Sequence, residues 1–342
     1  MYFYITYTLI IDLFFDITYT LYIQYRWRFL MATTLTIGNF KGGVGKTKMA
    51  TMLAFDNALI RNKKTLVLDL DPQGNATKIL ARTGGLSKIQ YTITDQIIDR
   101  HSKRYTETLK ALAQESPDKG IQQLEADPRA IIYTLTPEER AVSLDQCIYN
   151  IRENLDMIGC DTAFRNFPAF IRTYSNDEQE QVRFIANLIN DLKKQYDTIF
   201  IDVPPTISEF SDNAMAASDY SIIAFQTQDE SFDGVNKYIG YQNFMVEQFN
   251  INLQVIAIVA CMVEPDDNLD QEIYNEAKEA YGDVVADTII THQKRLKRYS
   301  REGIDLKTYK NGNFDQWDFK AHNGFNEILG EIESRDQYLK SL

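Results

Sequence analysis

The chain has 342 residues and a formal charge of −12, from 36 lysines and arginines against 48 aspartates and glutamates. Hydrophobic residues make up 44% and charged residues 25%, which excludes a disordered, collagen-like or coiled-coil chain. The three cysteines, Cys147, Cys160 and Cys261, lie far apart, so we expect neither a disulfide framework nor a cysteine-ligated metal, and a reducing cytosol fits best. The negative net charge argues against a protein that coats nucleic acid through its overall charge, but it is compatible with a local basic patch.

Residues 1–30 differ in composition from the rest, with 11 aromatic residues (six Tyr, four Phe and one Trp). Their longest uncharged run, from Met1 to Ile11, is shorter than the about 20 apolar residues of a membrane span. Basic residues follow this run instead of preceding it as in a signal peptide. Because Phe, Tyr and Ile are also what AT-rich non-coding sequence encodes, we expect residues 1–30 to be a mis-assigned start or a disordered leader and Met31 to be the biological start. A real N-terminal arm that packs or binds a partner is the alternative.

From Met31, short apolar runs alternate with longer amphipathic stretches, the pattern of βαβ units around a parallel sheet. The expected strands are Thr34–Gly38, Thr65–Leu70, Leu155–Ile158, Thr198–Val203, Tyr220–Gln226 and Val255–Val263. The expected helices are Lys46–Leu59, Asp177–Gln195 and a closing helix from Ile328. Residues 92–150 carry helical periodicity, with a helix start at Thr136 and Pro137. This predicts one α/β domain over residues 31–342, with a mostly parallel central sheet flanked by helices and residues 92–150 as a helical elaboration.

A glycine-rich loop, GNFKGGVGKT, follows the first expected strand at residues 38–47. Consecutive glycines let backbone N–H groups converge on phosphate oxygens, and the dipole of the following helix favours the same anion. Lys46 is expected to reach the β- and γ-phosphates and the Thr47 hydroxyl to ligate Mg²⁺. The general P-loop pattern has a glycine where this chain has Phe40, so the loop fits the variant with an early second lysine, Lys41. The predicted nucleotide contacts are Lys41, Gly42, Gly43, Val44, Gly45, Lys46, Thr47 and Lys48.

Three acids, Asp69, Asp71 and Asp202, fall at the carboxyl ends of expected strands, the edge where open α/β sheets bind ligands. A Mg²⁺ ion that bridges phosphates needs few carboxylates besides water, and Thr47 and Asp202 can supply its protein ligands. In phosphoryl transfer an acid also positions the attacking water. For Asp69, a cap or loop role is as compatible with the sequence as a catalytic one.

The segment Lys41–Thr47, KGGVGKT, resembles the deviant Walker A motif of the ParA/MinD group of P-loop ATPases. Leu66–Thr77, LVLDLDPQGNAT, resembles the second acidic motif of ParA partition ATPases. Asp197–Pro205, DTIFIDVPP, resembles the Walker B segment, which implies that Asp202 lies near Mg²⁺. The resemblance covers most of residues 31–330.

The resemblance implies a P-loop fold and a slow, partner-stimulated ATPase that uses ATP and Mg²⁺. It implies catalytic roles for Lys46, for Lys41, which reaches the partner's phosphates across a nucleotide-sandwiched dimer, and for Asp71, which helps to position water and metal. Two positions depart from the family. Lys48 stands where a second Thr is common, and Cys261 stands where an Asn often reads adenine, so ATP is assigned by the resemblance.

The segment Gln293–Arg301, QKRLKRYSR, holds five cations in nine residues of an acidic chain. Such a local concentration neutralises DNA phosphates without sequence preference, although an ordinary solvated helix face has the same composition. The corresponding late region of ParA proteins carries basic residues for non-specific DNA binding. The predicted DNA contacts are Lys294, Arg295, Lys297, Arg298 and Arg301.

These features predict a cytoplasmic, nucleoid-associated ATPase that partitions a plasmid or chromosome. Its ATP-bound homodimer would bind non-specific double-stranded DNA and leave it after hydrolysis stimulated by a ParB-like centromere-binding protein. The alternative is a MinD-like membrane-associated ATPase that positions cell division. Such proteins need a basic C-terminal amphipathic helix, whereas residues 326–342 carry four acids against two cations. An iron–sulfur or metal-insertion ATPase would need paired cysteines, and a tyrosine autokinase a C-terminal tyrosine cluster.

Overall fold

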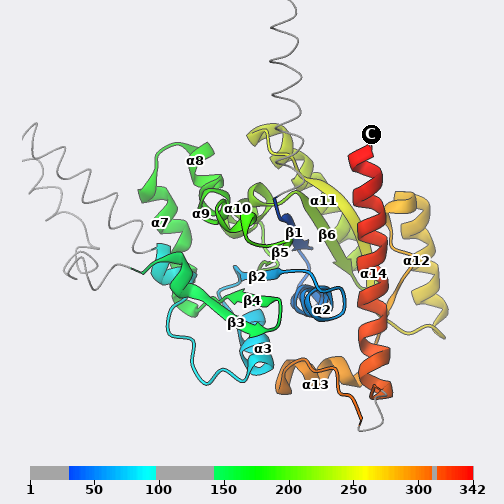
Figure 1. Ribbon diagram of the computed structural model, residues 1–342. Coiled ribbons are helices and arrows are strands. Elements are labelled where there is room, and N and C mark those ends of the chain that lie inside the picture. Colours follow the sequence, from blue (N-terminus) through cyan, green and yellow to red (C-terminus); the bar gives the residue numbers. More distant parts are fainter. Residues whose placement is uncertain (1–30, 98–141, 310–313, 342) are drawn as a thin grey trace, which may run out of the picture.

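The computed structural model describes residues 31–97, 142–309 and 314–341 (Figure 1). In these residues eight strands form one sheet in the order β3-β4-β2-β5-β1-β6-β7-β8. The strands are β1 Thr33–Gly38, β2 Thr65–Asp69, β3 Ile148–Arg152, β4 Leu155–Ile158, β5 Thr198–Asp202, β6 Tyr220–Phe225, β7 Gln254–Val263 and β8 Ile290–Thr291. Neighbouring strands are parallel except β3 and β4, which pair antiparallel at one edge. The predicted fold class, a mostly parallel sheet flanked by helices, is confirmed.

Helices cover both faces of the sheet because successive strand residues point to opposite faces. In β5, Phe200 joins the hydrophobic cluster on one face, and Ile199 and Ile201 join the cluster on the other. The first face is covered by α2 Lys46–Leu59, α3 Asn75–Gly84, α13 Lys294–Glu302 and α14 Gln316–Ser341. The second face is covered by α7 Phe167–Tyr174, α8 Glu178–Val182, α9 Phe184–Ile189, α10 Glu209–Ala217, α11 Asp229–Phe249 and α12 Asn268–Tyr281.

The strand register brings the predicted site to one point of the sheet. β1 lies between β5 and β6, and Ile37 near its end pairs with Asp202 of β5. Asp202 in turn pairs with Asp69 at the end of β2. Parallel strands share their carboxyl edge, so the loop after β1 and both acids meet there.

The single helix predicted over Asp177–Gln195 is wrong: the structure has α8, α9 and a 3₁₀ turn at Leu192–Lys194. The backbone of Arg183 (φ −91°, ψ 7°) separates α8 from α9. The Ile185 N–H does not continue the helical hydrogen-bond pattern, because it donates to Asn213 Oδ1 of α10 at 3.0 Å. A hydrogen bond to a distant element therefore breaks a helix that local periodicity favours.

The closing helix α14 begins at Gln316 and not at Ile328. Asp315 starts it, because its Oδ1 accepts the backbone N–H groups of Trp317 at 3.0 Å and Asp318 at 3.1 Å. An Asp before a helix is a standard N-cap signal.

Two predictions fall largely outside the described residues. Residues 1–30 and most of the predicted helical elaboration, including the helix start at Thr136 and Pro137, are not among them. The end of the 92–150 range is described, and its last residues open the edge strand β3 instead of continuing a helix.

Candidate nucleotide-binding site

The phosphate loop connects the carboxyl end of β1 to α2. Gly43 (φ 83°) and Gly45 (φ 97°) adopt left-handed backbone conformations that favour glycine. Asn39, which the sequence analysis missed, holds the start of the loop. Its Nδ2 donates to the Ala224 carbonyl at 2.9 Å, and its Oδ1 accepts the Lys41 N–H at 2.8 Å. The loop thus leads into the N-terminus of α2, where backbone N–H groups favour an anion.

Lys46 is the first residue of α2, and its side chain folds back over the loop. It is 6% exposed, and its Nζ donates to the Lys41 carbonyl at 2.9 Å. Burial lowers the pKa of Lys46 to about 8, while the carboxyl groups of Asp202 and Asp71 act in the opposite direction. An ammonium group has three N–H donors, and this bond uses one of them.

Asp202, at the end of β5, is fully buried. Within the described residues, neither of its carboxylate oxygens has a hydrogen-bond partner. Burial and then the neighbouring Asp69 raise the pKa of Asp202 well above its usual range, and Thr47 and Lys46 act against this rise. A buried carboxylate without a partner is costly unless a cation compensates it. The oxygens of Asp202 and Thr47 therefore fit Mg²⁺, which takes few protein ligands together with phosphate oxygens and water.

Asp69 is equally buried but fully hydrogen bonded. Its Oδ2 accepts the Thr77 N–H at 2.8 Å and the Thr77 hydroxyl at 2.7 Å, and its Oδ1 accepts the Asp71 N–H at 3.0 Å. Burial raises the pKa of Asp69 to about 6, and these hydrogen bonds oppose the shift. These contacts support the structural one of the two roles left open by the sequence, because through them Asp69 ties the loop after β2 to α3.

A cavity of about 500 Å³ lies in front of the phosphate loop. It brings together three residues that the sequence predicted to carry chemistry, Lys46, Thr47 and Asp71. Its volume is in the range of small-molecule sites. The lining residues are Gly43, Gly45, Lys46, Thr47, Lys48, Asp71, Gln73, Asn75, Lys78, Ile79, Arg82, Val203, Pro205, Met262 and Ser300.

Two cations of this cavity were missed by the sequence analysis. Lys78 and Arg82 lie one helical turn apart on α3 and line the same wall. Their four-residue spacing directly after the second acidic motif was the available signal, because it places both on one helix face.

Some predicted nucleotide contacts do not line the cavity. Lys41 is not among the lining residues, and its Nζ is 3.4 Å from Gln228 Oε1. The side chain of Val44 is buried in the hydrophobic core beside α2, which leaves only its backbone for a ligand. Gly42 is exposed and also lies outside the lining.

A second cavity of about 180 Å³ adjoins the first and shares Gly45, Lys48 and Met262 with it. Met262, near the end of β7, has a left-handed backbone (φ 59°), which is uncommon for a residue other than glycine. Cys261 lines this cavity, and burial raises the pKa of its thiol to about 12. The remaining lining residues are Met49, Ile290, Thr291, His292, Gln293, Leu296, Lys297 and Phe325.

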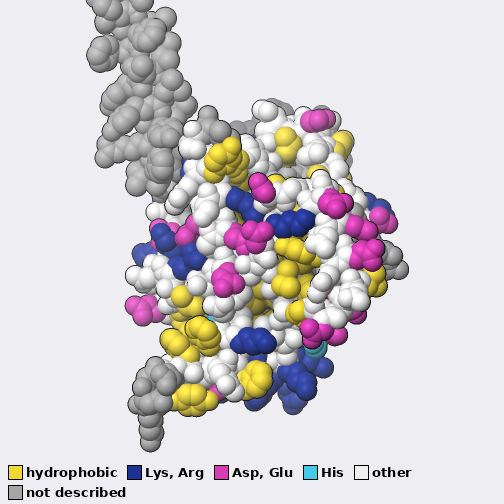
Figure 2. Space-filling view, turned by 90° about the vertical axis from the view of Figure 1, so that its right-hand side faces the viewer, with side chains coloured by type: hydrophobic (Ala, Val, Ile, Leu, Met, Phe, Trp, Pro, Cys, Tyr) yellow, Lys and Arg dark blue, Asp and Glu magenta, His cyan; other side chains and the backbone are white. Residues whose placement is uncertain are grey.

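The predicted basic stretch forms α13. Figure 2 shows Lys and Arg side chains gathered at the lower end of the molecule, where α13 lies in Figure 1. The helix borders the nucleotide cavity, because Ser300 lines it and the Ser300 carbonyl accepts from Arg82 Nη1 at 2.6 Å. Its exposed cations are Lys294, Lys297, Arg298 and Arg301.

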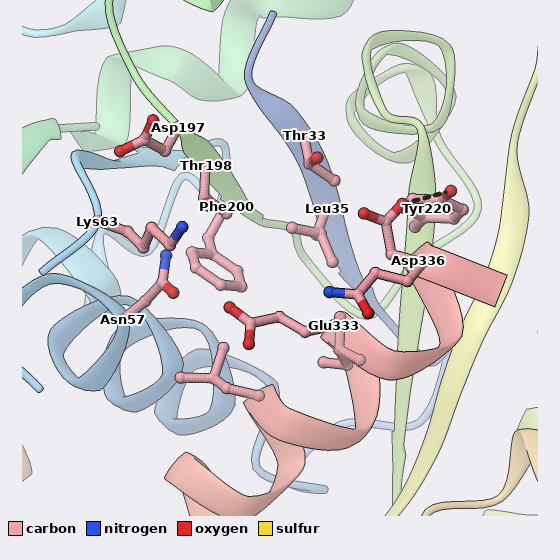
Figure 3. Close-up of a pocket in the computed structure, with 13 residues that line it drawn as sticks. Thr33, Leu35, Asn57, Lys63, Asp197, Thr198, Phe200, Tyr220, Glu333 and Asp336 are labelled. Carbon is pink, nitrogen blue, oxygen red and sulfur yellow. Dashed lines mark hydrogen bonds between the residues drawn. The ribbon is translucent and has the colours of Figure 1, made fainter. Parts of the chain in front are cut away.

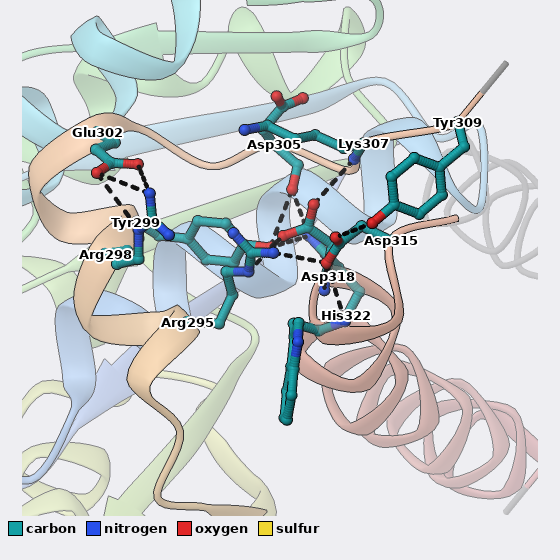
Figure 4. Close-up of polar contacts among 11 residues, drawn as sticks. Arg295, Arg298, Tyr299, Glu302, Asp305, Lys307, Tyr309, Asp315, Asp318 and His322 are labelled. Atoms are coloured by element: carbon teal, nitrogen blue, oxygen red, sulfur yellow. Dashed lines mark hydrogen bonds and ion pairs between the residues drawn. The ribbon is translucent and has the colours of Figure 1, made fainter. Parts of the chain in front are cut away.

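Arg295 departs from the predicted DNA-contacting set. Its side chain is 14% exposed and points into the protein (Figure 4). Its Nε lies 2.9 Å from Asp318 and its Nη2 lies 2.6 Å from Asp315. Sequence spacing gave no sign of this, because both acids follow α13 and contact it only in the folded protein. The exposed basic set is therefore one residue smaller than predicted.

A further cavity of about 330 Å³ lies at the opposite edge of the sheet, at the amino ends of β1, β5 and β6 (Figure 3). Its acids already have partners. Asp336 accepts from the Tyr220 hydroxyl at 2.8 Å, and Glu333 pairs with Arg61 at 2.5 Å. The candidate site is thus the carboxyl edge, where the phosphate loop lies and where Asp202 has no hydrogen-bond partner among the described residues.

The strand–loop–helix, the acids at the neighbouring strand ends and the cavity between them define a P-loop nucleotide-binding protein. A family model described as an AAA domain matches residues 32–255. The chain is 25% identical over 281 residues to the sporulation initiation inhibitor protein Soj of Bacillus subtilis, which covers 82% of this chain and 92% of that protein. It is 25% identical over 279 residues to the chromosome-partitioning ATPase Soj of Treponema pallidum, with 82% and 90% covered.

Among solved structures, the ATP complex of a single-residue variant of Cyanothece McdA has a TM-score of 0.61. The two chains are 16% identical, and the match covers 88% of this chain and 97% of that one. This likeness shows the fold. The chain belongs to the AAA-domain family and, within the P-loop ATPases, to the ParA family, as the sequence predicted.

Within the described residues, no helix combines the length and the apolar composition needed to cross a bilayer.

Proposed function

We propose that this protein is an ATP-dependent partition ATPase that moves a plasmid or chromosome by binding DNA. The observation that carries the proposal is Asp202, a fully buried carboxylate without a hydrogen-bond partner in the described part of the chain, next to the start of α2. A nucleotide-bound divalent cation would complete such a site. The partition-named relatives and the ATP complex of a structural neighbour support the same assignment.

In this proposal each predicted residue has a separate task. Lys46 neutralises charge on the β- and γ-phosphates, and Thr47 and Asp202 hold Mg²⁺, which when bound neutralises charge on the phosphate oxygens. Asp71 orients the attacking water. Lys41, which does not line the cavity of its own subunit, reaches the nucleotide of the second subunit in an ATP-bound homodimer.

The DNA-binding part of the proposal rests on α13. Its exposed cations are Lys294, Lys297, Arg298 and Arg301, and a dimer presents two copies of them, which raises the affinity of each for DNA through effective concentration. A ParB-like centromere-binding partner would stimulate hydrolysis and release. Residues 31–342 would form one ATPase domain that acts in the cytoplasm and on the nucleoid.

Replacing Asp71 with alanine is expected to lower the rate of ATP hydrolysis by about 100-fold and to leave ATP affinity within about threefold. Asp71 faces the cavity, but Lys46 and the loop backbone supply the phosphate contacts. Single-turnover hydrolysis and nucleotide binding, measured on the same preparation, check this. Fast hydrolysis by the variant would mean that another acid orients the water.

Non-specific duplex binding in the presence of ATP is expected to weaken steeply with salt. If half of the four exposed cations per chain contact phosphate, a dimer neutralises about four phosphates, and the slope of log affinity against log salt is about −3 to −4. The reversal Lys294→Glu with Arg301→Glu should abolish this binding and spare basal ATP turnover.

The matched control is Lys63→Glu with Lys64→Glu, which makes the same charge change on exposed residues at the other edge of the sheet. Equal losses in both variants would mean that net charge, and not α13, controls DNA affinity. Unchanged DNA binding in the α13 variant together with weaker binding to anionic vesicles would favour the MinD-like alternative.

A further inference from the structure

The basic helix α13 depends on the rest of the protein for its position. It is nine residues long and carries five cations. Cations that lie one helical turn apart repel each other. Isolated helices shorter than about 12–15 residues are marginal in water. Only Leu296 and Tyr299 of α13 are buried. The contacts that hold these two residues and Arg295 therefore decide where the exposed cations point.

Asp318 of α14 is the centre of these contacts (Figure 4). Its Oδ1 accepts from Arg295 Nε at 2.9 Å and from the Tyr299 hydroxyl at 2.5 Å. Its Oδ2 accepts from the Lys307 N–H, just beyond α13, at 3.1 Å. The carboxylate is only 1% exposed, so this cluster of donors offsets its desolvation and binds α13 to α14.

His322 extends the cluster from α14 to the phosphate-loop helix α2. Its Nδ1 makes a close contact with Oδ1 of Asp56, which is fully buried in the third turn of α2. Its Nε2 lies 3.3 Å from the Asp305 carbonyl and 3.3 Å from the Tyr299 hydroxyl. The same hydroxyl lies 2.5 Å from Asp318, so its proton points to the carboxylate and its lone pair faces the imidazole.

Both ring nitrogens of His322 thus face acceptors, an arrangement that suits the imidazolium, in which both carry a proton. The surrounding charges agree with this. The titratable groups around the ring are Asp56 of α2, Tyr299 of α13 and Asp318 of α14 itself. Arg61, just beyond α2, acts on Asp56, and Arg295 of α13 acts on Tyr299. Burial acts to lower the pKa of His322, but its hydrogen bond to Asp56 and the charge of Asp56 outweigh burial and raise it above the ordinary value.

We propose that His322 is a positioning residue for DNA binding: its protonated ring joins Asp56 of α2 to Tyr299 of α13 and holds the exposed cations of the basic helix in place. α2 begins at Lys46 in the nucleotide cavity, so this contact links the basic helix to the helix that carries the phosphate loop. The inference rests on the proposed DNA binding by α13.

The test compares the full-length protein with His322→Gln, with Mg²⁺, a non-hydrolysable ATP analogue and a fluorescent duplex of random sequence. At pH 6.5 the variant is expected to bind the duplex about 5- to 10-fold more weakly at unchanged nucleotide affinity. Burial raises the pKa of Asp56 to about 6, so Asp56 is charged above about pH 6, and the contact is lost as the pH rises further through the raised pKa of His322. Wild-type affinity should therefore fall as the pH increases above 6.5, and the variant should lack this component.

The matched control is His292→Gln, which removes the exposed ring just before α13 and leaves the buried contact intact. The proposal is overturned if the pH dependence disappears in His292→Gln and persists in His322→Gln. If His322→Gln unfolds, as thermal denaturation would reveal, Tyr299→Phe is used instead. It removes the hydroxyl that faces the ring, together with its bond to Asp318, and should weaken duplex binding and reduce its pH-dependent component. Unchanged duplex binding by Tyr299→Phe would then overturn the proposal.

The failures of the two proposals are distinguishable. A wild-type protein that binds no duplex at any pH contradicts the DNA-binding function itself. A wild-type protein that binds duplex, with a pH profile identical to that of His322→Gln, contradicts only the role of His322.

Discussion

Replacing Lys46 with alanine is expected to lower the affinity for MgATP by about 100-fold, because two charge-assisted hydrogen bonds of about 1.5 kcal/mol each are lost. Lys46 is the cation that lies over the phosphate loop, and its Nζ is already held by the Lys41 carbonyl. Isothermal titration calorimetry with MgATP measures the loss. The control is Lys64→Ala, an exposed lysine at the opposite edge of the sheet, which should bind as the wild type does.

The pH dependence of the same binding reaction tests the role of Lys46 without a mutation. The pKa of Lys46 in the free protein is about 8, and bound phosphates would raise it. Below pH 8 the lysine is already protonated, so affinity should change little. Above pH 8 binding must take up a proton, and affinity should fall by up to about tenfold per pH unit. A flat profile in the wild type from pH 7 to 9.5 would contradict a direct contact between Lys46 and phosphate.

Asp202→Asn is expected to make the nucleotide-free protein more stable and its nucleotide binding less dependent on Mg²⁺. The folded-state pKa of Asp202 is raised, so its ionisation opposes folding. The contribution of Asp202 to stability should thus be most favourable below about pH 4 and be lost as the pH rises through its raised pKa. Asparagine does not ionise, and at pH 7.5 the variant should be more stable by about 1–2 kcal/mol, or roughly 3–6 °C in Tm.

Thermal unfolding at pH 4 and pH 7.5, with and without MgATP, checks this. The two proteins should unfold alike at pH 4, and at pH 7.5 MgATP should stabilise the wild type more than the variant. Asp69→Asn is the matched control, because Asp69 is equally buried but accepts three hydrogen bonds that an amide cannot all replace. It should lose about 1–3 kcal/mol. A less stable Asp202→Asn protein at pH 7.5 would mean that the carboxylate has a partner that compensates its burial.

The sequence pattern alone predicted correctly those helices and strands whose local pattern matches their place in the folded protein. Thr33–Gly38 and Thr198–Asp202 are central strands, and both are rich in the β-branched residues Thr and Ile that are typical of strands. Lys46–Leu59 was predicted with correct bounds, because a glycine loop starts it and its sequence favours a helix throughout. The alternation of strands and helices was sufficient to predict a mostly parallel sheet. Because parallel strands share their carboxyl edge, it also predicted that Asp71 and Asp202 lie at the same edge of the sheet as the phosphate loop.

Roles that depend on residues distant in sequence became evident only in the folded protein. Asp69 and Asp202 have the same sequence context, yet Thr77 satisfies one and no described residue satisfies the other. From the sequence, Arg295 is indistinguishable from the other cations of the basic stretch. In the folded protein it pairs with Asp315 and Asp318, near the start of the next helix. The physical reason is common to both cases: desolvation and hydrogen-bond satisfaction are properties of a three-dimensional neighbourhood, which residue spacing along one strand or helix does not encode.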